Sequence, residues 1–482
     1  MRKGADATRR RLLQGGLALA AASTLPRDLV AEEESLPRWT VIETARDNDH
    51  RQARIEAPAP APSGTVATLA CGRETVGPAI VGFGGALTES AAHALAQLPK
   101  GKREDVLRSY FDPATGIGYT LARTHIGSCD FSLASWSLDD TADDRALRHF
   151  SLAPMRKTQV PLIRDVQQLV GKERLKLLAS PWSPPAWMKD NRSMLHGGSL
   201  REDCAAAWAD CYVRFVKAMR EEEKIPVWAL TVQNEPDATQ PWESCLYTAR
   251  EERDFIRDHL GPALEKARLG DIRLFGWDHN RDGLLERAVI MLGDPACAKY
   301  LAGLALHWYR SEDFGASRQV LTRFPDKQIL FTEGCVEGGP HAGEWEPAER
   351  YARNMIGDLN NGVCGFIDWN IALDLQGGPN HAGNFCHAPV LIDTATGEVH
   401  TQPSFHYIAH FSKYIATGAR RLQLAKKDKS LRTTAFANPD GSRVVVVCNP
   451  SDDARDFTLA VDDDVRACRA PARGMQTYVI AA

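Results

Sequence analysis

The sequence predicts a (β/α)₈ TIM barrel with an accessory antiparallel β-sandwich built from both ends of the chain, and three patterns support this fold class. Between residues 77 and 410, short apolar runs alternate with polar loops and helix-type stretches about eight times, as parallel βα units do. Polar and aromatic residues follow many of these runs directly, as they do at the mouth of a closed barrel. From residue 411 onward, short β-type runs separated by turn residues indicate an antiparallel sandwich.

The first 31 residues have the features of a bacterial export signal. Arg9, Arg10 and Arg11 precede a mostly apolar, uncharged stretch from Leu12 to Pro26. That stretch has about 15 residues, fewer than the roughly 20 that a helix needs to cross a bilayer, whereas an arginine pair before a short apolar region is typical of twin-arginine export. A basic amphipathic first helix is the alternative interpretation. No later stretch is long and apolar enough to span a bilayer, so we expect a periplasmic or secreted protein.

Residues 32–76 are expected to hold a linker and the first strands of the sandwich. This segment is polar, is rich in proline around residues 58–62, and contains a strand-type run at 39–44. If that run completes the C-terminal sheet, the first and last segments of the folded chain are neighbours. The β-type runs of the C-terminal part, residues 411–482, lie at 432–436, 443–448, 456–461 and 476–480.

The barrel is expected to occupy residues 77–410. An open, doubly wound sheet is the alternative, but it would gather the functional residues at one switch point, whereas here they follow many different strands. The expected strands are the apolar runs at 120–126, 176–179, 227–232, 273–276, 304–308, 328–332 and 365–369, and the helix-type stretches between them include 205–223 and 251–269.

Charge, cysteine content and motifs exclude several classes of function. The chain has 58 basic and 62 acidic side chains, a balance that argues against nucleic acid as a partner. Its 11 cysteines are odd in number and contain no Cys-x-x-Cys pair, so we expect free, mostly buried thiols. No zinc-protease, paired-cysteine or Gly-x-Ser-x-Gly motif is present, and we therefore expect no metal and no cofactor.

Two glutamates end apolar strands of the expected barrel and are the candidate catalytic pair. Glu235 stands between Asn234 and Pro236, and the proline ends the strand there. Glu333 follows the run at 328–332. The catalytic residues of barrel enzymes lie at the carboxyl ends of the strands. The side chains of Glu235 and Glu333 are therefore expected to face each other across the barrel mouth. A single glutamate at a strand end is more often structural or solvated, but the pair and the Asn-Glu-Pro context favour catalysis.

Cleavage of a glycosidic bond explains why two carboxyl groups would be needed. One must be ionised to attack the sugar, while the other gives a proton to the leaving oxygen and later takes one from water. Mutual repulsion is expected to raise the pKa of the proton donor. The amide of Asn234 is placed to hydrogen-bond the 2-hydroxyl of the sugar, a contact that strengthens in the transition state.

Aromatic and polar residues follow the other strands, as in a carbohydrate pocket. Apolar sugar faces stack on aromatic rings while the hydroxyls take charged or amide partners. A lone tryptophan is more often a core residue, and a lone histidine such as His307 is as readily structural as functional. The residues in question are Trp182, Trp187, His307, Trp308, Tyr309, Asp368, Trp369 and Asn370.

The glycine-rich stretch 82–85 is a weak signal for a nucleotide loop, because Leu87 stands where a dinucleotide fingerprint has its third glycine. We expect it to form a tight backbone turn that brings Thr88 and Glu89 to the rim of the pocket.

Taken in order, a series of motifs resembles glycoside hydrolase family 30, and most closely its acid β-glucosidase (glucosylceramidase) branch. The likeness extends from about residue 77 to 450. Its main motifs are Gly82 to Thr88, Ser128 to Ser132, Leu178 to Trp182, Asn234-Glu235-Pro236, Ala305 to Tyr309, Thr332 to Cys335, Asp368-Trp369-Asn370, Gly377 to Asn380, Asn384-Phe385 and His410 to Lys413.

The resemblance implies a (β/α)₈ barrel with a side β-sandwich and retaining hydrolysis of β-linked sugars. It implies that Glu235 is the acid/base and Glu333 the nucleophile, and it places Asp278 near an acidic position of the family. Glu89 stands where the glucosylceramidases carry aspartate, and the segment 336–349, which shapes the entrance for the leaving group, is shorter than in the lysosomal enzyme. The implied substrate-binding residues are Glu89, Asp130, Trp182, Asn234, His307, Tyr309, Trp369 and Asn384.

We therefore expect an exported retaining β-glycosidase that cleaves β-linked glucose from a glucosylceramide-like glycolipid or a related β-glucoside. Its expected partner is a glycolipid or oligosaccharide substrate, with transient contact to a membrane surface through a lipid substrate. The alternatives are a family member acting on β-1,6-glucan or a β-xyloside, and a non-catalytic carbohydrate-binding protein. The intact pair Glu235 and Glu333 speaks against the last of these.

Overall fold

The computed structural model describes residues 38–171, 173–427 and 429–482. The expected export signal, residues 1–31, and the start of the linker lie outside the described residues. Within the described part, no helix combines the length and the apolar character needed to cross a membrane.

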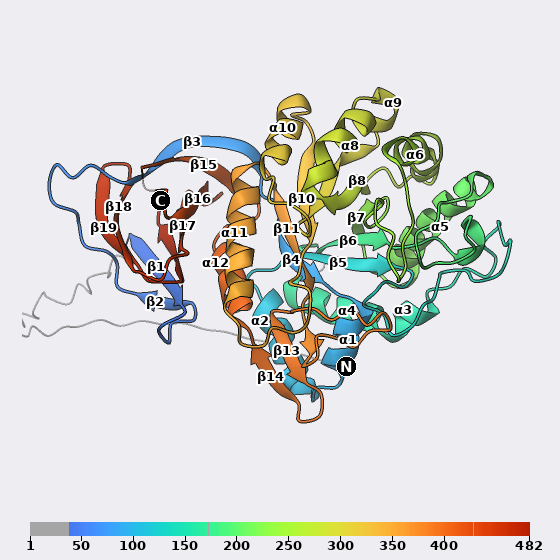
Figure 1. Cartoon of the computed structure of the whole chain (residues 1–482), viewed down its shortest axis with the longest axis horizontal. Helices are drawn as coiled ribbons and strands as arrows, with labels where there is room; N and C mark the ends of the chain where they lie inside the picture. The colour runs from blue at the N-terminus through green and yellow to red at the C-terminus, as the bar shows by residue number, and fades with distance from the viewer. Residues whose placement is uncertain (1–37, 172, 428) are drawn as a thin grey trace, which may run out of the picture. The chain divides into compact units, whose positions relative to one another are not determined.

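Eight parallel strands close into a barrel, as the sequence predicts (Figure 1). Closure excludes the open sheet, because the strand that follows residue 364 pairs both with its predecessor and with the first strand of the set. The strands are β4 (Gly82–Ala86), β5 (Leu121–Ile126), β6 (Lys176–Pro181), β7 (Val227–Thr231), β8 (Arg273–Asn280), β9 (Leu301–His307), β10 (Gln328–Glu333) and β11 (Gly365–Asn370).

The first barrel strand lies where a tight turn was expected, and that expectation is wrong. Residues 82–86 form β4, which pairs in parallel with β5 on one side and β11 on the other. A side chain on Gly84 would lie 1.9 Å from the carbonyl oxygen of Leu121. Glycine is therefore needed for the close approach of two strands rather than for a turn. Thr88 lies two residues after β4, and its hydroxyl caps the next helix by accepting from the backbone N–H of Ala91.

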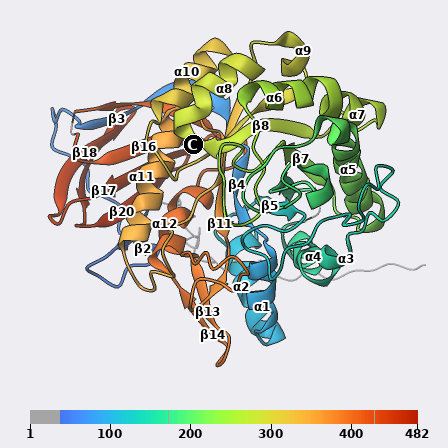
Figure 2. The same ribbon diagram turned by 45° about the vertical axis from the view of Figure 1, so that its right-hand side comes forward.

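Helices follow the strands and surround the barrel (Figure 2). The expected helix 205–223 is α5 continued by a π-helical turn at Ala218–Glu222, and the expected helix 251–269 is α6, a π-helical turn at Ile256–Leu260, and α7. The helices are α1 (Glu89–Ala96), α2 (Lys100–Phe111), α3 (Ala153–Lys157), α4 (Gln159–Val170), α5 (Ala205–Lys217), α6 (Ala249–Phe255), α7 (Gly261–Lys266), α8 (Leu284–Met291), α9 (Pro295–Ala298), α10 (Gly315–Arg323), α11 (Glu346–Asn360) and α12 (Pro403–Ser412).

The sandwich is a nine-stranded, mostly antiparallel sheet in the order β19-β18-β3-β15-β16-β17-β20-β1-β2. Strand β1 lies between β2 and β20, and its pairing with β20 runs from Trp39 opposite Ile480 to Ala45 opposite Gly474. The first and last strands of the sheet, β1 and β20, are therefore neighbours, as expected. The strands are β1 (Trp39–Ala45), β2 (Ala53–Ile55), β3 (Leu69–Ala79), β15 (Arg420–Lys426), β16 (Arg432–Ala437), β17 (Arg443–Asn449), β18 (Arg455–Val461), β19 (Asp464–Ala470) and β20 (Gly474–Ile480).

Helix α12 fixes the sandwich to the barrel. The ring of His410 is fully buried, and its nitrogens lie 2.8 Å from the hydroxyl of Thr477 in β20 and 2.9 Å from that of Thr44 in β1. Beyond the barrel strands, a small sheet is formed by β12 (Leu373–Asp374), β13 (Val390–Asp393) and β14 (Glu398–Thr401). All 11 cysteines of the chain are buried and free, which confirms the expectation of unpaired thiols.

Candidate active site

The candidate catalytic glutamates lie at the carboxyl ends of two barrel strands and line one cavity of about 190 Å³. Glu333 is the last residue of β10, and Glu235 follows β7 by four positions. The backbone of Glu235 is in the left-handed region, with φ of 46°, which a non-glycine residue adopts only under constraint. Its N–H donates to the carbonyl of Asp278 at 3.0 Å, and this hydrogen bond helps to hold the turn.

One imidazole nitrogen borders both carboxylates. His307 Nδ1 lies 3.1 Å from Glu235 Oε1 and 4.0 Å from Glu333 Oε1. The other ring nitrogen, Nε2, lies 3.1 Å from the carboxylate of Asp278, which fixes the orientation of the ring. The two glutamates therefore face the same small volume at the mouth of the barrel.

Glu333 is held by two donors. The hydroxyl of Tyr309 donates to Oε1 at 2.8 Å, and the guanidinium of Arg123 donates to Oε2. Burial raises the pKa of Glu333 above its ordinary value even though the charges of His307 and Arg123 oppose the rise. Both donors stabilise the ionised carboxylate, the form that can attack a sugar carbon.

The protonation of Glu235 differs from the expected one. Burial favours the neutral acid, but the imidazoles of His279 and His307 outweigh burial and lower the pKa of Glu235 well below the ordinary range of a glutamate. Burial alone would lower the pKa of His307, yet the charge of Glu333 and the hydrogen bonds to Asp278 and Glu235 raise it to about 9. The expected rise of the pKa of the proton donor is therefore wrong for this arrangement, because two imidazoles favour the ionised form of Glu235.

A buried ion pair lies next to Glu333, and sequence reasoning named only one of its members, Asp278, through the family resemblance. Arg123, in β5, and Asp278, in β8, are fully buried and lie 2.8 Å apart. Asp278 also accepts hydrogen bonds at 2.6 Å from the hydroxyls of Thr231 and Thr332. Burial would raise its pKa, but the charge of Arg123 and the bond from His307 lower that pKa well below the usual range. An arginine inside an otherwise apolar strand was the available signal for this pair.

Most of the residues that the family resemblance implied for sugar binding line the cavity. The rings of Trp182 and Trp369 are stacked, with centroids 5.4 Å apart. Asp130 Oδ2 accepts from the amide of Asn384 at 2.8 Å, while Oδ1 is buried and has no partner within the described residues. Burial and the charge of Glu333 raise the pKa of Asp130 to about 8. The implied residues found in the cavity wall are Asp130, Trp182, Asn234, Tyr309, Trp369 and Asn384.

Two of the implied residues do not line the cavity. His307 lies behind Glu235 and is fully buried. Glu89 begins α1 and accepts a hydrogen bond from the indole of Trp136 at 3.0 Å, so it is directed to a loop rather than to the cavity. The structure thus brings His307 to the catalytic pair but leaves Glu89 outside the cavity wall.

Several further residues of the wall were not found from the sequence. His279 and Asn280 end β8, directly after Asp278, and their place at a strand end was a usable signal. The others come from loops whose path the sequence did not reveal. These lining residues are Ala238, Gln240, Trp242, His279, Asn280, Arg310, Cys335, Glu337 and Cys386.

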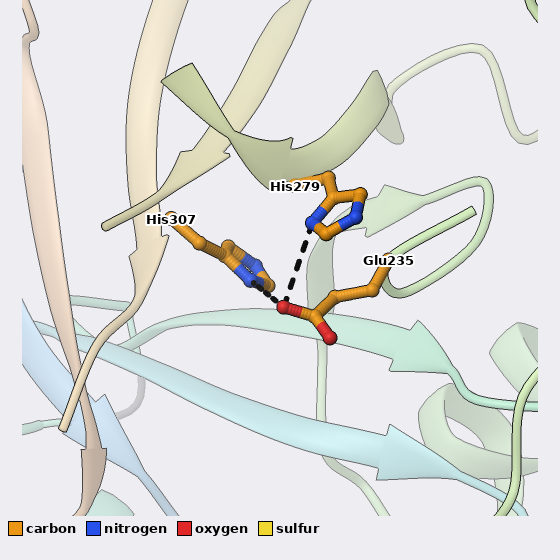
Figure 3. A group of neighbouring side chains, drawn as sticks. All are labelled: Glu235, His279 and His307. Atoms are coloured by element: carbon orange, nitrogen blue, oxygen red, sulfur yellow. Dashed lines mark hydrogen bonds and ion pairs between the residues drawn. The ribbon is translucent and has the colours of Figure 1, made fainter. Parts of the chain in front are cut away.

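One group of residues, two of them in the cavity wall and one behind it, has the composition of a metal site. Glu235, His279 and His307 each offer one ligand atom, and the three atoms lie within 4.8 Å of one another (Figure 3). A second group of this kind, Asp139, Asp144 and His149, lies outside the cavity wall.

Comparisons with known proteins agree with this geometry. The model of the glycosyl hydrolase family 30 TIM-barrel domain matches residues 80–415, and that of the family's β-sandwich domain matches residues 418–478. The chain is 35% identical to the lysosomal acid glucosylceramidase of Mus musculus over 404 residues, which are 80% of this chain and 77% of that protein. It is 29% identical to an endo-1,6-beta-D-glucanase of Neurospora crassa over 391 residues, which are 77% and 78% of the two chains.

Solved structures show the same relationship. The crystal structure of SrfJ from Salmonella typhimurium matches with a TM-score of 0.88 at 34% identity, covering 92% of this chain and all of that one. The endo-beta1,6-glucanase BT3312 matches with a TM-score of 0.82 at 25% identity, with the same coverage.

Proposed function

Because the chain belongs to glycoside hydrolase family 30 and is a glycoside hydrolase, we propose that it is a retaining β-glucosidase. Its proposed substrate is a glucosylceramide-like glycolipid or a related β-glucoside. Glu333 is the proposed nucleophile and Glu235 the proposed acid/base. The observation that carries the proposal is the position of both carboxylates against one nitrogen of His307 at the wall of one cavity.

In the first step, an oxygen of Glu333 attacks the anomeric carbon while the bond to the leaving oxygen breaks, which gives a glycosyl ester. Glu235 gives its proton to the leaving oxygen in the same step. In the second step, Glu235 takes a proton from water, whose oxygen attacks the anomeric carbon and releases Glu333 as a carboxylate. Two inversions leave the sugar in the β-configuration.

The proton for the first step is one hydrogen bond away from Glu235. His307 holds it at Nδ1, 3.1 Å from Glu235 Oε1, and transfer along this hydrogen bond converts Glu235 into the acid. Asp278 stabilises the charged imidazole from the other side. When Glu333 becomes an ester, the negative charge that raises the pKa of His307 disappears, and the second step restores that charge.

The cavity supports recognition of a single terminal sugar. The stacked rings of Trp182 and Trp369 offer an apolar wall, while the free oxygen of Asp130 and the amides of Asn234 and Asn384 offer partners for hydroxyls. The volume of about 190 Å³ is below the roughly 300 Å³ at which pockets for larger ligands begin. This favours removal of an end sugar over cleavage within a polysaccharide.

A second candidate is hydrolysis of β-1,6-glucan or a β-xyloside. It is supported by relatives and structural neighbours that are themselves named endo-1,6-glucanase. The greater identity to proteins named glucosylceramidase, 35% against 29%, favours the β-glucoside.

We expect the purified protein to hydrolyse an aryl β-glucoside and glucosylceramide, because both present a terminal glucose to the small cavity. Aryl β-xyloside is expected to react at least about tenfold more slowly, because xylose lacks the hydroxymethyl group of glucose and one missing sugar contact costs about 1.4 kcal/mol or more. β-1,6-Glucan is also expected to react more slowly, because only the ends of its chains present a terminal glucose. The measurement is kcat/KM for all four substrates under one condition. Preferred hydrolysis of glucan, with internal cuts in the product profile, would contradict the proposal.

We also propose that the protein is exported by a twin-arginine route. The support is the sequence around Arg9 and Arg10 and the 11 buried, free cysteines, which suit a protein that folds in a reducing compartment before export. Replacing both arginines with lysine is expected to keep the protein in the cytoplasm of a bacterial host, as measured by fractionation. Unchanged export of this variant would argue for another route.

A further inference from the structure

We propose that Glu235, His279 and His307 form a binding site for a transition-metal ion such as Zn²⁺, and that the bound ion switches the glycosidase off. Binding rests on the geometry of the three side chains alone. The inhibition rests on the proposed function, because it requires that Glu235 be the acid/base.

Two of the three separations between the ligand atoms suit a common ion, and all three atoms lie within 4.8 Å of one another. Glu235 Oε1 lies 3.1 Å from His307 Nδ1 and 3.5 Å from His279 Nδ1, and both imidazoles point at this one oxygen (Figure 3). Zinc binds imidazole nitrogen at about 2.0–2.1 Å and carboxylate oxygen at about 2.0–2.2 Å, so ligand atoms on a tetrahedral ion are about 3.3 Å apart. The two distances bracket this value.

Asn280 prepares His279 as a ligand. The amide oxygen of Asn280 accepts the backbone N–H of Tyr309 at 2.6 Å, so its nitrogen is the donor that lies 3.1 Å from His279 Nδ1. In neutral His279 the proton is therefore on Nε2, and the single lone pair of Nδ1 accepts from this amide. Nδ1 lies 3.5 Å from Glu235 Oε1, so a metal ion bound to Glu235 would take the place of the amide on that lone pair.

His307 has the second contact that metal-binding histidines usually make. Its Nε2 lies 3.1 Å from the buried carboxylate of Asp278, which fixes the ring and increases the basicity of Nδ1. Two imidazoles and one carboxylate on one side of an ion form a set that suits Zn²⁺, Ni²⁺ and Cu²⁺.

The cavity gives an ion a path to the site and leaves room for water as a fourth ligand. Glu235 and His279 both line the cavity wall. Cys335 and Cys386 line the same wall, but burial raises the pKa of the Cys335 thiol well above its ordinary value, which disfavours the thiolate that metals bind. The cluster Glu235, His279 and His307 is therefore the better ligand set in this cavity.

A metal ion here would replace the proton that Glu235 needs. Oε1 would coordinate the ion, and the proton on His307 Nδ1 would be released to solvent on binding. The leaving oxygen would then lack its proton donor, so hydrolysis would stop until a chelator removed the ion.

The test uses the full chain with Zn²⁺ as the probe, and it reads binding and activity separately. Titration calorimetry is expected to show one ion bound per wild-type chain, and aryl β-glucoside hydrolysis is expected to fall to below about a tenth and recover with EDTA. His279→Leu is expected to weaken binding at least about tenfold and to relieve inhibition of its remaining activity by the same factor. Glu235→Gln, which keeps the shape of the side chain, is expected to weaken binding by a similar factor.

Matched variants locate the ion. His149→Leu, in the group Asp139, Asp144 and His149 outside the cavity wall, is expected to leave both binding and inhibition unchanged, and Cys335→Ser is expected to leave Zn²⁺ affinity unchanged. The proposal is overturned if the wild type binds no ion, if His279→Leu and Glu235→Gln both bind as tightly as the wild type, or if Cys335→Ser abolishes binding. One ion bound by an enzyme that keeps full activity would overturn the proposed inhibition and would argue against Glu235 as the acid/base.

Discussion

Replacing Glu333 with glutamine is expected to lower kcat/KM for an aryl β-glucoside by about 10⁴-fold or more. The amide cannot attack the anomeric carbon, and loss of a nucleophile removes the whole covalent route. Glutamine has the same shape and can still accept from Tyr309, so folding is expected to be kept, although one carboxylate partner of Arg123 is lost. The measurement is initial rate at low substrate concentration, together with the thermal unfolding midpoint.

The matched control for this change is Glu344→Gln. Glu344 is exposed, lies outside the cavity wall and pairs with His341 at the surface, so the same chemical change is expected to leave the rate within about twofold. A slowly released fluoro-sugar gives a second readout, because the wild type is expected to gain the mass of one sugar on the peptide that contains Glu333. A rate for Glu333→Gln within tenfold of the wild type would rule this residue out as the nucleophile.

Replacing Glu235 with glutamine is expected to have an effect that depends on the leaving group. For an alkyl glucoside or glucosylceramide, whose leaving oxygen needs a proton, kcat/KM is expected to fall by about 10²–10⁴-fold. For a dinitrophenyl glucoside, whose leaving group departs without a proton, kcat/KM is expected to change by less than about tenfold. The measurement is a series of aryl glucosides ordered by the pKa of the released phenol.

Hydrolysis of the glycosyl ester, the second step of the reaction, gives an independent test of the role of Glu235. Without a base to activate water, the glycosyl ester of the Glu235→Gln variant is expected to accumulate, which appears as a burst of phenol followed by a slow steady rate. Azide, an anion that attacks without a base, is expected to restore that steady rate. An equal loss on all leaving groups, with no burst, would show that Glu235 acts on binding or folding instead.

Much of the fold could be predicted because most barrel strands are marked in the sequence by a short apolar run. Seven of the barrel strands were found in the sequence as apolar runs bounded by polar loops. The strand β4 was not found, because its glycines are typical of a turn. The reason for glycine at position 84 is the closeness of Leu121 in β5, a contact between strands that no local pattern shows. The strands β3, β15 and β19 were missed for a different reason, because their residues are half-exposed and lack a clear apolar run.

The candidate site was predictable where a residue type and a strand end coincide. Glu235 and Glu333 were found in this way, and both line the cavity. Arg123 was not found, because its role depends on its contacts with Asp278 and Glu333, which lie on other strands of the barrel. The protonation pattern was predicted in the wrong direction, because it depends on two imidazoles that reach Glu235 from β8 and β9.

The place of β1 in the large sheet has a consequence for how the chain folds during synthesis. Trp39–Ala45 is made well before one of its two partners, β20, which begins only at Gly474. The edge of β1 that faces β20 must therefore stay unsatisfied until β20 has been made, and the pairing joins residues 39–45 to residues 474–480. Such long-range pairing is slow, so a cell that makes this protein has to shield an exposed, aggregation-prone strand edge for the duration of its synthesis.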